Sequence, residues 1–287
     1  MIRGMYTGAA GMIVQQHTMD AISNNLANVD TTAYKEDVSV HKAFPELMLR
    51  RMNTEITQLP ISRTAPHLGS VDRAPVVGKL GTGVEQNEVF TVFEQGSMKQ
   101  TGNSFDLALE GDGFFVVQTP YGERLTRNGS FHLGPEGLLV TKEGYPVLGE
   151  NGPIRAKANN FIVDQDGRVF HNERFADDPE RLVSQTENEW DETVQVDTLR
   201  MVDVDSSRYL KKMGSSLYRT TWESGDAYTL QDSRPKVRQG FLETSNVNPV
   251  KQMVKMIEVN RAYEANQKVI QSHDQASDKL INQAMRF

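Results

Sequence analysis

The six histidines are the first residues to consider for chemistry, because imidazole binds metal ions and transfers protons near neutral pH. They are widely scattered: His17, His41, His67, His132, His171 and His273. No two of them have the HExxH or HxH spacing that places two imidazoles on one zinc ion. The chain also contains no cysteine, which excludes disulfides, cysteine-bound zinc, iron–sulfur clusters and thiol nucleophiles.

Three short loops resemble the beginnings of ligand-binding motifs. The sequences at Gly81–Gly83 and Gly111–Gly113 start like nucleotide loops, but each lacks the third glycine and neither precedes a helical pattern. The sequence at Asp164–Gly167 starts like a calcium loop but lacks the acidic ligands that should follow. We therefore expect ordinary turns at all three places.

Carboxylates at Asp106, Glu110 and Asp112 are close enough in sequence to suggest the acid pair of a glycosidase. Strands and turns bring such groups together routinely, and Ser215 and Ser216 lack the glycines of a nucleophile elbow. The residues therefore predict a protein that is not an enzyme, with no catalytic residues, cofactor or metal. A protein that cleaves or binds glycans, for example peptidoglycan, is the alternative from a different functional class.

Composition narrows the functional classes further. The 287 residues carry 31 Lys and Arg against 38 Asp and Glu, a net charge of −7, which disfavours a nucleic-acid binder. Hydrophobic residues make up 38%, enough for a folded core but not for membrane spans. Residues 1–29 lack the unbroken apolar run of a secretory signal. We expect any export to keep this segment uncleaved.

Glycine distribution separates the ends of the chain from the middle. Eleven of the 22 glycines lie between Gly96 and Gly152, whereas none lies between Met12 and Leu68 or after Gly240. Glycine marks turns and weakens helices, so the middle is predicted to be β and the ends helical. We place a β-rich domain at 73–229, connecting extended or hairpin segments at 37–72 plus 230–247, and a terminal helical module at 1–36 plus 248–287.

The middle shows strands separated by turn dipeptides. Asp112-Gly113, Glu136-Gly137 and Asp166-Gly167 each stand between short apolar runs, a pattern that favours antiparallel hairpins. Between Val194 and Met201 the apolar alternation shifts by one residue, which predicts a β-bulge. The fold class is therefore α+β: long N- and C-terminal helices, similar to a coiled coil, flank a mostly antiparallel β domain.

Apolar residues recur along both ends with the period of a coiled-coil seam. The N-terminal seam consists of Met5, Met12, Met19 and Leu26. The C-terminal seam includes Val250, Met253, Met256, Val259, Tyr263, Ile270 and Leu280. Asn248 before Pro249 predicts the start of the C-terminal helix.

Polar residues interrupt both seams, at Gln16, Asn266, His273 and Ser277. Polar residues on a seam typically fix its register and its partner at a cost in stability. Two interpretations stay open: an intramolecular helical hairpin, or ends that become ordered only when several subunits assemble.

An amide-rich segment closes the first helical region. Asn24, Asn25 and Asn28 each offer hydrogen-bond donors and acceptors on neighbouring helical faces. One interpretation is a helix that ends at Asn28, because asparagine tolerates the left-handed conformation found there. The other is an assembly interface, in which these amides join the seam residues in contacts with neighbouring subunits.

Three blocks of sequence resemble the axial proteins of the bacterial flagellum, specifically the rod proteins of the hook-basal body. They are SNNLANVDTTAYK at residues 23–35, QTGNSFDLALEGDGFF at residues 100–115 followed by TRNGSF at 126–131, and GFLETSNVNPV at residues 240–250. The chain looks more similar to the proximal than to the distal rod subunit, with a distal rod or hook component as the alternative. The family usually has Gly where this chain has Ala33, so a positive φ there would be costly.

The resemblance implies a mechanical function. Proteins of this family are exported unfolded by the flagellar type III apparatus without a cleaved signal. They assemble helically with copies of themselves and with other axial proteins into a drive shaft that crosses the periplasm and transmits torque for motility. No nucleic-acid partner and no membrane insertion are expected. Two regions have no assigned role: the acidic segment 172–192 and residues 44–81, where we expect an extended hairpin that packs on an adjacent subunit.

Overall fold

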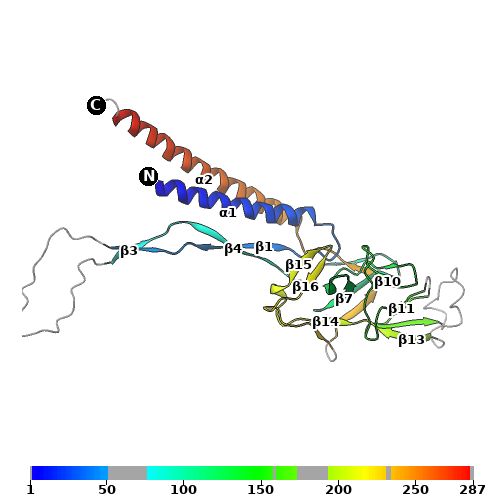
Figure 1. Ribbon diagram of the computed structural model, residues 1–287. Coiled ribbons are helices and arrows are strands. Elements are labelled where there is room, and N and C mark those ends of the chain that lie inside the picture. Colours follow the sequence, from blue (N-terminus) through cyan, green and yellow to red (C-terminus); the bar gives the residue numbers. More distant parts are fainter. Residues whose placement is uncertain (1, 51–75, 158–159, 173–192, 231–233, 285–287) are drawn as a thin grey trace, which may run out of the picture. The chain divides into compact units, whose positions relative to one another are not determined.

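A computed structural model describes residues 2–50, 76–157, 160–172, 193–230 and 234–284 (Figure 1). Nearly all of the acidic segment and the central part of the expected 44–81 hairpin lie outside these ranges. The chain divides into two compact units. One contains residues 1–20, 39–88 and 257–287, and the other contains residues 21–38 and 89–256. Each unit is built from segments far apart in sequence.

Two long helices form the ends of the chain. Helix α1 spans Ile2–Ala27 and helix α2 spans Pro249–Ala284. The start of α2 is capped as the sequence predicted, because the Asn248 side-chain oxygen accepts a hydrogen bond from the Lys251 amide at 3.2 Å. The expected α+β class is confirmed.

Two strand pairs follow α1 along the chain. The first joins β1 (Asp37–Ala43) to β4 (Val84–Thr91). The second joins β2 (Leu47–Arg50) antiparallel to β3 (Val76–Leu80). The described flanks of the 44–81 segment therefore pair as a hairpin would.

A six-stranded antiparallel sheet dominates the β region, in the order β15-β16-β8-β7-β14-β17. In this spatial order its strands are Lys211–Gly214, Leu217–Arg219, Gly122–Thr126, Phe114–Thr119, Met201–Asp203 and Tyr228–Thr229. A short 3-10 helix, Ser207–Tyr209, precedes β15.

Smaller sheets complete the β region. β6 (Leu107–Glu110) pairs with β18 (Lys236–Gln239), and β5 (Met98–Gln100) pairs with β19 (Phe241–Glu243). A further two-stranded sheet contains β9 (His132–Leu133) and β10 (Leu139–Val140). A three-stranded sheet contains β11 (Ile162–Val163), β12 (Arg168–Asn172) and β13 (Thr193–Thr198). The pairing of β5 and β6 with β19 and β18 joins the start of the β region to the segment that leads into α2.

Two of the three predicted hairpins and the bulge are present. The turn at Glu136-Gly137 joins β9 to β10, and the turn at Asp166-Gly167 joins β11 to β12. The hairpin predicted at Asp112-Gly113 is wrong, because β6 pairs with β18 while β7 pairs with β8 and β14. At the first of these turns the Gly137 amide donates to the Gly134 carbonyl, and Glu136 and Gly137 both have positive φ, 64° and 70°. Along β13, Asp197 faces Val169 and Gln195 faces Phe170, so Val196 is the extra residue of a β-bulge. The chain then leaves this sheet and enters the six-stranded sheet at Met201.

Two apolar clusters form the core of the β region. The larger contains Leu107, Phe115, Phe131, Leu199 and Met201, each at most 1% exposed. The second surrounds Tyr218, whose ring lies 5.0 Å from that of Phe93 and 5.9 Å from that of Phe114. The segments that follow α1 and precede α2 are anchored beside this core.

Candidate assembly and coupling site

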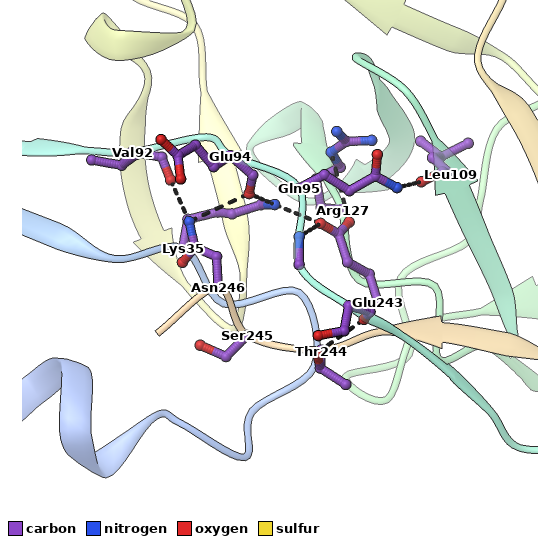
Figure 2. Close-up of polar contacts among 12 residues, drawn as sticks. Lys35, Val92, Glu94, Gln95, Leu109, Arg127, Glu243, Thr244, Ser245 and Asn246 are labelled. Carbon is purple, nitrogen blue, oxygen red and sulfur yellow. Dashed lines mark hydrogen bonds and ion pairs between the residues drawn. The ribbon is translucent and has the colours of Figure 1, made fainter. Parts of the chain in front are cut away.

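Lys35 and Glu243 form a buried ion pair between the segment after α1 and the segment before α2. Lys35 Nζ lies 2.6 Å from Glu243 Oε1, and the two side chains are 0% and 1% exposed (Figure 2). Lys35 Nζ also donates to the Glu94 carbonyl at 2.6 Å. Burial lowers the pKa of Lys35, and the Glu243 carboxylate opposes this shift. The charge is therefore compensated by its partner rather than by water.

The Glu243 carboxylate also connects to the β region. Its Oε1 accepts the Gly96 amide at 2.9 Å, and its Oε2 lies 3.9 Å from Arg127 Nε. Arg127 donates to the Gly111 carbonyl at 2.7 Å and lies over the Phe114 ring. We call Lys35, Glu94, Gly96, Arg127 and Glu243 the Lys35 junction. It is a buried polar network, in which breaking one pair is costly.

A second set of bonds runs beside the Lys35 junction. Asn246 accepts the Glu36 amide at 2.8 Å and donates to the Val92 carbonyl at 2.9 Å. Gln252, on the first turn of α2, donates to the Glu36 carboxylate at 2.7 Å. Lys255, one turn further, lies 3.2 Å from the same carboxylate. The start of α2 is thus held to Glu36 by its own side chains.

Ala33 has the positive φ that the sequence comparison anticipated. Its φ is 54°, its side chain is 1% exposed, and its amide donates to the Glu243 carbonyl at 2.9 Å. A left-handed conformation costs a residue with a Cβ roughly 1–2 kcal/mol. The contacts around the Lys35 junction hold this backbone in place.

The amide-rich segment divides between the interior and the surface. Asn25 is 1% exposed and bonds within the chain: it donates to the Asp37 carbonyl and accepts the Asp37 amide and the Tyr34 hydroxyl. Asn24 is exposed, and its side-chain oxygen accepts a bond from Asn28 Nδ2 at 2.7 Å. Asn25 therefore fixes the turn from α1 into β1 within a single chain.

Helices α1 and α2 contact each other through three glycines. A Cβ built on Gly8 would lie 3.0 Å from Ile270, one on Gly11 would lie 2.7 Å from Asn266, and one on Gly4 would overlap His273. Because increasing residue number on α1 meets decreasing number on α2, the helices are antiparallel here (Figure 1). Asn266 and His273, which interrupt the predicted seam, lie against this glycine face.

The predicted seam residues differ in exposure. On α1, Met5, Met12, Met19 and Leu26 are half-buried. On α2, Met256, Val259, Tyr263 and Ile270 are half-buried, whereas Val250, Met253 and Leu280 are 67%, 49% and 47% exposed. The structure brings Ile270 to α1, but it gives the exposed residues no covering partner among the described residues.

An exposed apolar stripe lies on the first turns of α2. It contains Val250, Met253, Val254 and Ile257, which are 49% to 67% exposed. At 100° per residue these positions gather on the side of α2 opposite Asn266 and Ile270. We call these four residues the α2 stripe. A helix that is apolar on two opposite sides needs a second surface to cover it.

Two of the three carboxylates considered for glycan chemistry, Asp106 and Glu110, have structural partners. Glu110 lies 2.8 Å from Arg238 Nε, and Asp106 is 5% exposed and accepts a bond from Asn103. Asp164, in the loop that resembles a calcium site, makes the bonds of an ordinary turn. Its side-chain oxygen accepts a hydrogen bond from the Gln165 amide, and its backbone carbonyl accepts one from the Gly167 amide. Within the described ranges, no three His, Cys, Asp or Glu side chains gather as a metal site would require.

Sequence reasoning missed the Lys35 junction and the glycine face. Lys35 and Glu243 each belong to a block that carries the family resemblance, but their separation of 208 residues gave no sign that they pair. Gly4, Gly8 and Gly11 recur at helical spacing, and this pattern could have indicated a close helix contact. No helix among the described residues is long and apolar enough to cross a membrane.

Three family models match separate parts of the chain. Residues 5–35 match "Flagella basal body rod protein", residues 108–171 match "Flagellar hook protein FlgE/F/G D1 domain", and residues 238–283 match "Flagellar basal body rod FlgEFG protein C-terminal". The first and last matches contain Lys35 and Glu243, respectively.

Full-length relatives agree with these matches. A flagellar basal-body rod protein FlgG of Buchnera aphidicola subsp. Schizaphis graminum is 34% identical over 98% of this chain and 99% of its own length. FlgG of Bacillus subtilis is 30% identical over 98% and 99%, respectively. A flagellar basal-body rod protein FlgF of Caulobacter vibrioides is 33% identical over 98% and 97%.

Proposed function

Because this chain belongs to the flagellar basal-body rod protein family, we propose that the α2 stripe is the surface by which it joins neighbouring axial subunits. The family makes the chain a structural subunit of the rod, located in the flagellar basal body and serving motility. Its role is structural, as one subunit of a shaft, and we propose that it carries out no catalysis.

The exposure of the α2 stripe is the observation that carries this proposal. Val250, Met253, Val254 and Ile257 present apolar surface that a stable monomer would normally bury. A neighbouring helix with a complementary apolar face would cover the α2 stripe and extend the helix contacts into a coiled-coil-like array. Copies of this chain and other axial proteins are the partners, since head-to-tail contacts that do not close into a ring produce a helical shaft.

The other predicted interface residues belong to the same proposal. The half-buried seam of α1, with Met5, Met12, Met19 and Leu26, supplies apolar surface alongside α2. Asn24 and Asn28 are accessible enough to add polar contacts, while the bonds of Asn25 stay within the chain. We further propose export in an unfolded state through the type III apparatus with no cleaved signal, and a place in the proximal rod, with the distal rod or hook as the alternative.

Substitution within the α2 stripe tests the proposal. Ile257→Arg should leave the isolated protein folded, because the side chain is 53% exposed, but should prevent rod assembly and swimming when it replaces the normal gene. Gln267→Arg, at an exposed polar position of the same helix, is the control of equal charge change and should swim normally. Intact rods in the Ile257→Arg strain would overturn the assignment of this surface.

A further inference from the structure

A single tryptophan stands out on the surface of the β region. Trp222 lies in the loop between β16 and β17 and is 90% exposed. A large aromatic side chain that stays exposed to water does not contribute the favourable free energy of burying its apolar surface. Tryptophan is enriched at the centres of binding surfaces. An exposed tryptophan on a rigid backbone therefore indicates a binding surface.

The loop that carries Trp222 is held by hydrogen bonds on both sides. The Thr221 amide donates to Ser224 Oγ at 2.8 Å, and Ser224 Oγ donates back to the Thr221 carbonyl at 2.9 Å. Thr221 Oγ1 donates to the Tyr209 carbonyl at 2.8 Å, and Ser224 is completely buried. The loop is therefore ordered before any partner arrives, which lowers the entropy cost of binding.

Four carboxylates lie in this loop or next to it. Glu223 and Asp226 follow Trp222 in the chain and are exposed, and the Asp205 carboxylate lies against Gly225. Asp203 pairs with Tyr228 across the β14–β17 ladder. The negative charges of Asp203 and Asp205 raise the pKa of the exposed Tyr228. None of the four carboxylates forms a salt bridge with a Lys, Arg or His in the part of the chain that the structure describes.

An indole face beside unpaired carboxylates is complementary to a cation. Arginine stacks on tryptophan and bonds to carboxylates in the same approach, and such cation–π contacts contribute roughly 0.5–2 kcal/mol. Acidic residues outnumber basic ones in this chain, 38 against 31, so a more basic protein matches this surface better than a second copy does. The partner should therefore be a different and more basic protein.

We propose that Trp222, with Asp203, Asp205, Glu223 and Asp226, forms a docking surface for an arginine-rich segment of a protein other than this chain. The Trp222 indole receives one guanidinium on its face, and the carboxylates bind the same or neighbouring cations. These residues are distinct from the α2 stripe, so failure of this proposal would leave the proposed function unaffected.

Fluorescence tests the chemistry on the full chain. The protein has two tryptophans, so Trp190→Phe leaves Trp222 as the only indole reporter. A short peptide of alternating arginine and glycine should change its emission, and the matching glutamate peptide should not. Asp205→Asn with Glu223→Gln should weaken binding of the arginine peptide about fivefold. Equal responses to both peptides, or binding unaffected by the neutral variants, would refute the proposal.

Photo-crosslinking identifies the occupant in cells. A photoreactive amino acid at position 222 should crosslink, in isolated basal bodies, to a different protein at an arginine-containing segment. The same group at Tyr121, which is 84% exposed on the β7–β8 turn, is the control and should not yield this product. Crosslinks only to a second copy, crosslinks shared with position 121, or no product would each contradict the assignment.

Discussion

At the scale of single residues, the Lys35 junction is where the two ends of the chain meet the β region. Lys35 and Glu243 are both essentially inaccessible to water, and each charge depends on the other. Removing one partner would leave a buried charge without its nearest partner, whereas removing both would leave only Arg127 charged at this site. This asymmetry makes the ion pair testable by a double-mutant cycle.

Lys35→Met should reduce the free energy of unfolding by about 3–5 kcal/mol, because the Glu243 carboxylate then stays buried with only Arg127, 3.9 Å away, as its cation. Glu243→Leu should do at least as much damage, because it leaves both Lys35 and Arg127 buried without a carboxylate. The double variant should recover only part of the loss of Glu243→Leu, since the Arg127 charge stays uncompensated. Urea unfolding of the four proteins measures the cycle, and losses that simply add would argue against the pair as described.

A second prediction at this scale concerns alkaline pH. Burial, with the Asp37 charge as a further cause, raises the pKa of Tyr218, which is 1% exposed. Above about pH 10 the unfolded chain ionises this phenol while the folded chain keeps it protonated. Stability is therefore retained below pH 10 and lost as pH rises, by up to about 1.4 kcal/mol per pH unit for this group.

Tyr218→Phe should remove that part of the alkaline sensitivity, since the ring still packs against Phe93 and Phe114. Urea unfolding at several values between pH 9 and pH 11.5 compares the variant with the wild type. Lys35 has a lowered pKa and contributes the opposite slope below about pH 10.5, but it is present in both proteins. Identical pH slopes for the two proteins would contradict the burial of Tyr218.

At the scale of elements, the contact between α1 and α2 depends on glycines of α1, which have no side chain. Gly4, Gly8 and Gly11 remove side chains so that Asn266, Ile270 and His273 can approach the helix backbone. Glycine within a helix costs roughly 1 kcal/mol relative to alanine. This cost is offset only if the close approach is maintained.

Gly8→Leu should therefore destabilise the helices, despite leucine's higher helix propensity, by ~2 kcal/mol from overpacking against Ile270. Thr7→Leu adds the same side chain at the adjacent exposed position and should change stability by less than about 0.5 kcal/mol. Thermal unfolding followed by far-ultraviolet circular dichroism compares them. A stabilised Gly8→Leu protein would show that the glycine face does not hold the helices together.

Local chemistry explains which elements were predictable from sequence. The Asn248 cap, the turn at Glu136-Gly137 and the bulge at Val196 each depend on residues a few positions apart, so their patterns were readable. The α1–α2 contact differs from the predicted apolar seam in one respect. Asn266 and His273 lie against Gly11 and Gly4, which lack side chains and so leave room for these two polar residues.

At the scale of the whole molecule, the sequence predicted the α+β class and the rod family. It did not predict which side chains pair between the segment after α1 and the segment around the start of α2. Lys35 bonds to Glu243 208 positions away, and Gln252 bonds to Glu36 216 positions away. No local periodicity reports such pairings. The boundaries expected for the three domains stay a prediction, as do the interface roles of the seam residues.

The central claim is that the α2 stripe is covered by neighbouring axial subunits in the rod. A cryo-electron microscopy reconstruction of basal bodies that contain this chain measures that directly. We predict that Val250, Met253, Val254 and Ile257, exposed in the single chain, lie buried against the helices of adjacent subunits. A reconstruction in which these four side chains face water or the empty lumen would contradict the account.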